Sequence, residues 1–184
     1  VYNNRIIMKE KGLHPKNKFN KGYDFDALIV ENPLLKEFVL ENKFGSISID
    51  FSNPNAVKEL NKALLFSYDK LNLWNFSDEN LCPPIPGRLD YILHLSDLLS
   101  EEKDIKILDI GTGATCIYPL LGVAEFNWNF IATDIDLDSL DSAQDIIDDN
   151  NLLYLSSFEV NKDKSLLSLF LSNHSLTPNL LCII

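Results

Sequence analysis

Residues 105–113 read Ile-Lys-Ile-Leu-Asp-Ile-Gly-Thr-Gly, a short apolar run that leads directly into a glycine-rich turn. The run predicts a buried strand over 105–110. Gly111 and Gly113 favour a tight turn, because glycine adopts backbone angles that other residues avoid. A second apolar run, 129–133, ends at Asp134, and a helix is expected between the two strands. Strand, helix and strand in this order predict a parallel sheet in an α/β fold.

The rest of the chain continues this alternation toward the C-terminus and differs from it toward the N-terminus. After the second strand we expect a helix over 139–149, a weak strand over 154–160, a helical stretch over 166–171 and a strand over 180–184. Before the first strand we expect short helices within 24–40, a strand over 46–51, a helix opened by Asn53 and Pro54, a loop over 69–87 and a helix after it. Alternation in the strand over 46–51 places Ile47, Ile49 and Phe51 on one half-buried face.

The residues of the glycine turn indicate which cofactor it would bind. A dinucleotide fingerprint has a third glycine where this chain has Cys116, and the acid Asp109 would repel a phosphate group. S-adenosylmethionine carries an ammonium and a sulfonium and no phosphate, so an acid beside the turn suits it. Asp134, at the end of the next strand, is placed to hold ribose hydroxyls. We therefore expect a Rossmann-like, S-adenosylmethionine-dependent methyltransferase sheet; the alternative is that the glycines only turn the chain.

Composition and charge limit the class of protein. The chain has 184 residues, 46% of them hydrophobic, which is enough to form the core of one domain, or of one domain and a fragment. A net charge of −11 excludes a uniformly basic nucleic-acid-binding surface. The 3 cysteines follow no disulfide or zinc spacing, and no apolar run reaches the ~18 residues of a membrane span. We expect a cytoplasmic protein, or a nuclear one in a eukaryote, that uses no metal.

The first 22 residues differ in charge from the acidic remainder. They contain six basic residues and one acid, and Lys16, Lys18 and Lys21 fall close together. Such a segment is either a basic arm with a function of its own or a solvated terminus.

Several segments match a known family. The most specific are Pro84-Ile-Pro-Gly-Arg-Leu-Asp-Tyr-Ile92 and Asp109-Ile-Gly-Thr-Gly-Ala-Thr-Cys-Ile-Tyr-Pro-Leu120, supported by Leu13-His-Pro-Lys-Asn-Lys-Phe19 and the stretch 49–65. Across residues 13–155 the chain resembles the adenine-N6 ribosomal RNA methyltransferase family, which modifies one adenosine of bacterial 23S rRNA. The family has eukaryotic methyltransferase-like relatives that act on small nuclear RNA and mRNA hairpins.

The resemblance implies an activity and a set of site residues. The activity is methyl transfer from S-adenosyl-L-methionine to an adenine amine in structured RNA, either rRNA or small nuclear RNA, by a monomer. Arg88 is implied to hold the methionine carboxylate of the cofactor, Asp134 the ribose, and Ser165 the region of the adenine ring. With the turn itself, the expected cofactor-binding residues are Arg88, Asp109, Gly111, Gly113, Thr115, Asp134 and Ser165. Lys16, Lys18 and Lys21 are implied to contact RNA.

One motif of such enzymes is missing. Enzymes that methylate an adenine amine carry Asn-Pro-Pro-Phe or a close variant after the fourth strand, and neither Asn53-Pro54 nor Thr177-Pro178-Asn179 fits that context. The final run, 180–184, resembles the fourth strand itself. We therefore expect a truncated chain, inactive alone, with a basic arm over 1–22, an N-terminal extension over 23–100 and half a methyltransferase sheet over 101–184. The alternatives are a non-catalytic cofactor- or RNA-binding remnant and a methyltransferase for protein or small molecules.

Overall fold

The computed structural model describes residues 12–68, 71–100, 105–152 and 180–183. A parallel sheet of β3 (Lys106–Ile110), β4 (Asn129–Thr133) and β5 (Leu180–Ile183) has the order β4-β3-β5. The central strand β3 pairs in register with both neighbours, Lys106 with the first residue of each. The predicted parallel α/β fold is thereby confirmed, with three strands at the positions predicted for them.

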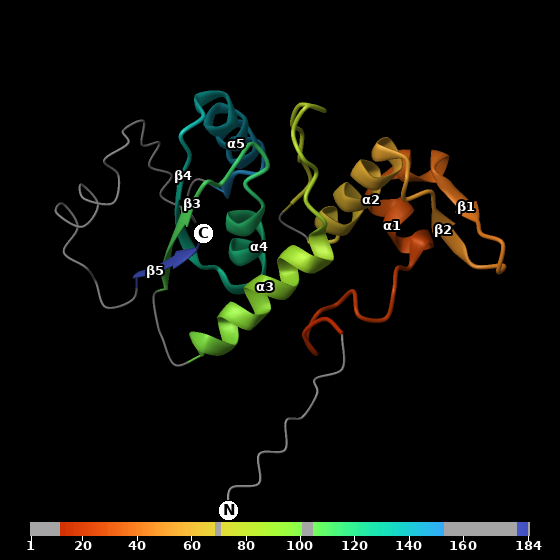
Figure 1. Ribbon diagram of the computed structural model, residues 1–184, viewed down its shortest axis with the longest axis horizontal. Helices are drawn as coiled ribbons and strands as arrows, with labels where there is room; N and C mark the ends of the chain where they lie inside the picture. Colours follow the sequence, from red (N-terminus) through yellow and green to blue (C-terminus); the bar gives the residue numbers. More distant parts are fainter. Residues whose placement is uncertain (1–11, 69–70, 101–104, 153–179, 184) are drawn as a thin grey trace, which may run out of the picture.

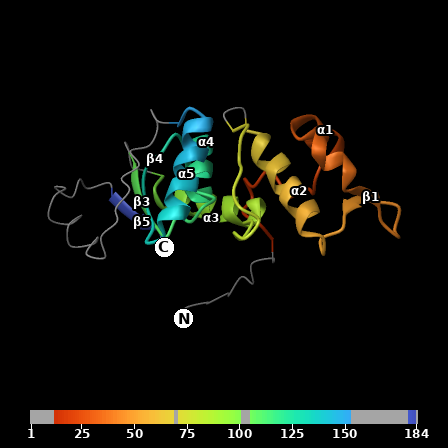
Figure 2. The same cartoon turned by 90° about the horizontal axis from the view of Figure 1, so that it is seen from above.

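Three helices cover one face of this sheet and separate it from the N-terminal part of the chain, as both views show (Figures 1 and 2). They are α3 (Ile85–Leu98), α4 (Ile117–Phe126) and α5 (Leu137–Asp149). The predicted helix between the first two strands is α4, and Gly122 explains how closely it packs on the sheet. A Cβ at Gly122 would lie 2.6 Å from Cε2 of Phe130 on β4, well inside van der Waals contact.

Two of these helices begin earlier than the sequence indicated. α3 starts at Ile85, inside the proline run that was expected to be an extended loop up to Gly87. Proline is tolerated in a first helical turn, because the amide groups there have no intrahelical partner to lose. α5 starts at Leu137 because the Asp136 side chain accepts a hydrogen bond from the Ser139 amide and caps the helix. The strand expected over 154–160 and the helix over 166–171 lie outside the described residues.

The N-terminal extension is a small α+β unit. It contains α1 (Phe25–Glu31), a 3-10 helix η1 (Pro33–Glu37), the antiparallel pair β1 (Val39–Glu41) and β2 (Ile47–Ile49), and α2 (Pro54–Phe66). The helices and β2 agree with the prediction, but β1 is not predicted, because the expected helical stretch, 24–40, extends over its first two residues. The predicted buried face of β2 is also wrong: Ile47 and Phe51 are 54% and 60% exposed, and Ile49 alone is buried. Phe51 lies beyond the strand, in the turn before α2, and the two-stranded ribbon offers too little surface to cover a whole face.

One hydrophobic core runs through both parts of the molecule. It extends from Phe25 in α1 to Leu152 after α5, and includes Leu64 of α2, Leu89 of α3 and Leu120 of α4. The division at residue 100 therefore stays a prediction about organisation along the chain, since the packing is continuous across it. In the described part of the chain, no helix has the length and apolar character required to cross a membrane.

Candidate functional site

The predicted glycine turn follows the carboxyl end of β3. Gly111 and Gly113 have φ of +79° and +65°, in the left-handed region, so their glycine identity is explained by backbone geometry. The amides of Gly111 and Thr112 both donate to the Thr133 carbonyl at the end of β4, at 2.8 and 2.9 Å. Nothing lies within 4 Å of where a Cβ would be built at either glycine. The turn is therefore anchored to β4 and leaves open space on its glycine side.

Asp134 lies directly after β4 and reaches this turn. Its Oδ2 accepts a hydrogen bond from the Gly113 amide at 2.8 Å, and its Oδ1 accepts one from the Asp136 amide at 3.0 Å. The side chain is half-buried. The fold thus brings the predicted ribose-binding acid and the predicted turn together, because parallel neighbouring strands end at the same edge of the sheet.

Asp109 is buried beneath the turn, with 2% of its surface exposed. Burial raises the pKa of this carboxyl to about 6, and the nearby charge of Asp134 adds to the rise, while Thr112 partly offsets it. Asp109 Oδ2 and Thr112 Oγ1 are buried and have no hydrogen-bond partner of ordinary geometry. Buried polar atoms are nearly always satisfied, so this carboxylate oxygen and this hydroxyl at a glycine turn are atoms that a polar ligand group would satisfy.

Arg88 lies in the first turn of α3, next to α4. Its Nη1 donates to the Tyr118 hydroxyl at 2.8 Å, and its guanidinium carbon lies 5.4 Å from the centre of the Tyr118 ring. Its Nε is buried without a partner. Tyr118 belongs to the first turn of α4, which begins directly after the glycine turn. The contact with Tyr118 therefore directs Arg88 toward the start of α4.

Two predicted cofactor residues remain, Thr115 and Ser165. Thr115 is buried in the turn, and its carbonyl accepts a hydrogen bond from Trp74 Nε1 at 2.9 Å. Ser165 lies outside the described residues.

The sequence analysis does not identify Thr112 and Tyr118 as polar residues of the candidate site, although both lie inside the motif 109–120. It also missed Trp74, and no local pattern indicates a contact between residues 41 positions apart.

The basic residues near the N-terminus make contacts on the N-terminal half of the molecule. Lys16 Nζ lies 3.5 Å from Asp97 Oδ1 on α3. Lys18 Nζ donates to Ser67 Oγ at 2.9 Å and lies over the Tyr68 ring, while Lys21 is exposed. Lys16 and Lys18 are also exposed, so their ammonium groups remain accessible while taking part in these contacts.

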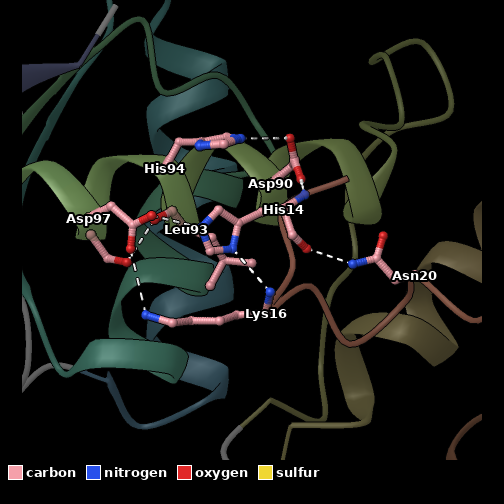
Figure 3. A network of polar contacts seen from close by, with 8 residues as sticks. His14, Lys16, Asn20, Asp90, Leu93, His94 and Asp97 are labelled. Atoms are coloured by element: carbon pink, nitrogen blue, oxygen red, sulfur yellow. Dashed lines mark hydrogen bonds and ion pairs between the residues drawn. The ribbon is translucent and has the colours of Figure 1, made fainter. Parts of the chain in front are cut away.

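A polar cluster attaches this basic segment to α3 (Figure 3). The buried His14 donates from its backbone amide to Asp90, and its Nε2 lies 2.9 Å from Asp97 Oδ2. His94 Nε2 lies 3.6 Å from Asp90 Oδ2. The hydrogen bond from the His14 side chain, and then the nearby charge of Lys16, hold the pKa of Asp97 below its usual range. The cluster fixes where the segment around Lys16 lies on α3.

Donor atoms of His14, His94 and Asp97 all lie within 4.8 Å of one another, which is close enough to consider a metal site. The hydrogen bonds argue against that role. His14 Nδ1 accepts a hydrogen bond from the Lys16 amide at 3.1 Å, so in the neutral ring the proton is on Nε2, which donates to Asp97. A metal would need the Nε2 lone pair, and Lys16 already balances the charge of Asp97. We interpret the cluster as an anchor.

Asn53-Pro54 has a structural explanation. Asn53 Oδ1 accepts hydrogen bonds from the Asn55 and Ala56 amides and caps α2, and Pro54 is the first helical residue. This agrees with the expectation that the pair is a helix start. The other proline-containing stretch, 177–179, lies outside the described residues.

Comparisons with known proteins agree with this geometry. A family model described as RNA methyltransferase matches residues 7–174. Ribosomal RNA large subunit methyltransferase F of Photobacterium profundum is 47% identical over 158 residues, which are 82% of this chain and 47% of that protein. The chain spans about half the length of the curated relatives it matches.

Solved structures show the same fold. The N-terminal domain of human METTL16 in complex with SAH has a TM-score of 0.74 at 34% identity, covering 84% of this chain and 61% of that one. The hMettl16 catalytic domain in complex with the MAT2A 3'UTR hairpin 6 has a TM-score of 0.74 at 35% identity, covering 84% and 55%. With the family model, the relatives and a strand-end turn of the expected geometry in agreement, the chain belongs to the RNA methyltransferase family.

Proposed function

We propose that this chain is the S-adenosylmethionine-binding half of an enzyme that forms N6-methyladenosine in structured RNA, acting as a monomer in the cytoplasm. Membership of the RNA methyltransferase family supports the reaction class. The ribosomal RNA methyltransferases among its relatives, and the neighbour solved with an RNA hairpin, support structured RNA as substrate. The neighbour solved with SAH supports the cofactor.

The buried pair Asp109 and Thr112 is the observation that carries the cofactor assignment. One carboxylate oxygen of Asp109 and the Thr112 hydroxyl have no hydrogen bond of ordinary geometry beneath the glycine turn, and they suit a ligand with a positively charged, hydrogen-donating group. The Asp109 carboxylate disfavours a pyrophosphate, because it repels the negative charge of phosphate and donates no hydrogen bond to it. The ammonium of S-adenosylmethionine meets this requirement, so the residues present fit the cofactor.

Each remaining residue of the site has a role that follows from its chemistry. Arg88 carries a guanidinium suited to the cofactor carboxylate, and Tyr118 orients it. Asp134 suits the ribose hydroxyls, and the open side of Gly111 and Gly113 admits the ligand close to the backbone. Bound S-adenosylmethionine supplies an electrophilic methyl group on sulfur. This chain's contribution is to bind and orient that group, because positioning reacting groups lowers the barrier to their reaction.

Substitution of Asp134 tests the cofactor site. Asp134→Ala should weaken binding of S-adenosylhomocysteine by about 1.5–3 kcal/mol, because a charged hydrogen bond to ribose is lost. Asp134→Asn keeps an acceptor for the Gly113 amide and separates the loss of charge from a collapse of the turn. Asp138→Ala, an exposed acid in the first turn of α5, is the matched control. Titration calorimetry measures all four proteins, and equal affinity in every one would remove Asp134 from the site.

Lysine substitutions test the contact with RNA. Changing Lys16, Lys18 and Lys21 together to glutamine should lower RNA affinity and reduce the slope of log affinity against log salt by about 0.7–0.9 for each phosphate that is no longer neutralised. Changing the exposed Lys36, Lys43 and Lys106 removes the same charge from other surfaces and is the control. Binding to unmodified large-subunit rRNA fragments is measured across a salt series. An unchanged slope in the first variant would identify the segment as a solvated terminus.

A further inference from the structure

Two carbonyl groups of the glycine turn are held from outside by side chains of other elements. The Ala114 carbonyl accepts a hydrogen bond from Ser142 Oγ of α5 at 3.0 Å. The next carbonyl, of Thr115, accepts one from Trp74 Nε1 at 2.9 Å. Directly after it comes Cys116, a non-glycine residue in the left-handed region with φ of +51°. Such a residue is strained and keeps its conformation only where its surroundings enforce it.

The side chain of Trp74 is itself firmly placed. It is fully buried, and its ring packs edge-on against Phe76 at 4.8 Å. The backbone just before it is fixed to the C-terminal end of α5 by the buried Asn150. Asn150 Oδ1 accepts hydrogen bonds from the Asn72 and Leu73 amides at 2.9 and 3.2 Å, and its Nδ2 donates to the Leu73 carbonyl at 2.6 Å. The indole N–H is thus presented to the turn by a residue whose preceding backbone is fixed to the end of α5.

We propose that Trp74 is a positioning residue of the S-adenosylmethionine site, although it belongs to the N-terminal extension. Its indole N–H fixes the Thr115 carbonyl, holds Cys116 in its left-handed conformation, and so keeps the amides and side chains of residues 111–115 directed at the ligand. The identity of the ligand rests on the proposed function. The claim that Trp74 fixes the turn rests on hydrogen bonds that are independent of the identity of the ligand.

Removal of the N–H without removal of the ring separates positioning from packing. Trp74 replaced by 3-benzothienylalanine keeps the bicyclic shape and has sulfur where the indole has N–H. Trp128 with the same replacement is the control, since it is buried and stacked on Phe126 at 4.7 Å. Trp74→Phe adds a variant that also loses volume.

Amide hydrogen exchange in the absence of ligand measures how often the turn opens. The amides of Thr112, Gly113 and Leu120 are hydrogen-bonded to Thr133, Asp134 and Cys116, so they exchange when the turn or the start of α4 opens. In the Trp74 analogue these amides should exchange about tenfold faster or more, because the Thr115 carbonyl loses its partner. Exchange in α2, and in the Trp128 control, should stay as in the unsubstituted chain.

Calorimetric titration with S-adenosylhomocysteine then connects the turn to the ligand. The dissociation constant should rise about fivefold or more for the Trp74 analogue and stay unchanged for the Trp128 control, because part of the binding energy is used to order the turn. Unchanged exchange in residues 112–120, or faster exchange with unchanged affinity, would overturn the inference. Failure of the unsubstituted chain to bind S-adenosylhomocysteine would overturn the proposed function instead, and exchange would still decide whether Trp74 holds the turn.

Discussion

Asp109→Asn should make the folded chain more stable at neutral pH. The carboxyl is buried, and its pKa is raised from 3.8 to about 6. Its ionised form is therefore disfavoured in the folded state relative to the unfolded state. The asparagine side chain has nearly the same shape and no charge, so the substitution removes this penalty while it keeps the packing beneath the turn.

The magnitude and its pH dependence follow from proton linkage. Each tenfold difference in proton affinity between folded and unfolded states is worth about 1.4 kcal/mol, so the penalty approaches about 3 kcal/mol once Asp109 is ionised in both states. The folded state binds the proton more tightly, so wild-type stability falls, relative to the variant, as pH rises from about 4 to about 6. Below about pH 4 the two proteins should differ little, and above about pH 6 the variant should be more stable by about 1–3 kcal/mol.

Urea unfolding followed by tryptophan fluorescence at pH 4, 5, 6 and 7.5 measures this difference. Asp145→Asn, at an exposed position of α5, is the control for removal of one carboxylate. A stability difference that does not change with pH, or a variant less stable than wild type at pH 7.5, would refute the reasoning. The same variant should bind S-adenosylmethionine more weakly at pH 7.5, since the ammonium loses its charged partner. This loss of affinity with a gain in stability is typical of a functional buried charge.

Two further substitutions test how the fold positions the site, each measured by urea unfolding. Gly122→Ala should destabilise the chain by about 1–3 kcal/mol, because the added methyl group overlaps the Phe130 ring that α4 covers; stability equal to wild type would show that α4 can move off the sheet at no cost. Asn53→Ala should cost about 1 kcal/mol by removing the cap of α2, and Asn53→Asp should restore most of it; no loss in the alanine variant would show that Pro54 alone starts the helix.

Helices, strands and turns that are specified by neighbouring residues could be predicted from the sequence. The helix cap at Asn53 and Pro54, the apolar strand before Gly111 and the presence of a helix after the glycine turn all depend on residues within a few positions of one another. The glycine turn, and Asp134 at the end of the next strand, were predictable because a parallel α/β unit places both at one sheet edge. The errors lie where a local signal was ambiguous: residues 39–41 form a strand only because β2 pairs with them.

The sequence by itself determined the α/β class, the family resemblance and the location of the glycine turn, because periodicity, glycine spacing and motif are properties of neighbouring residues. Only the tertiary structure decided which polar groups are buried without partners. The raised pKa of Asp109 depends on packing from several elements. The hydrogen bonds from Trp74 to Thr115 and from Arg88 to Tyr118 join residues that are 41 and 30 positions apart in the sequence. His14 and Asp97, which are 83 positions apart, also form a hydrogen bond. Contacts of that separation arise only when the hydrophobic core assembles, so no local pattern encodes them.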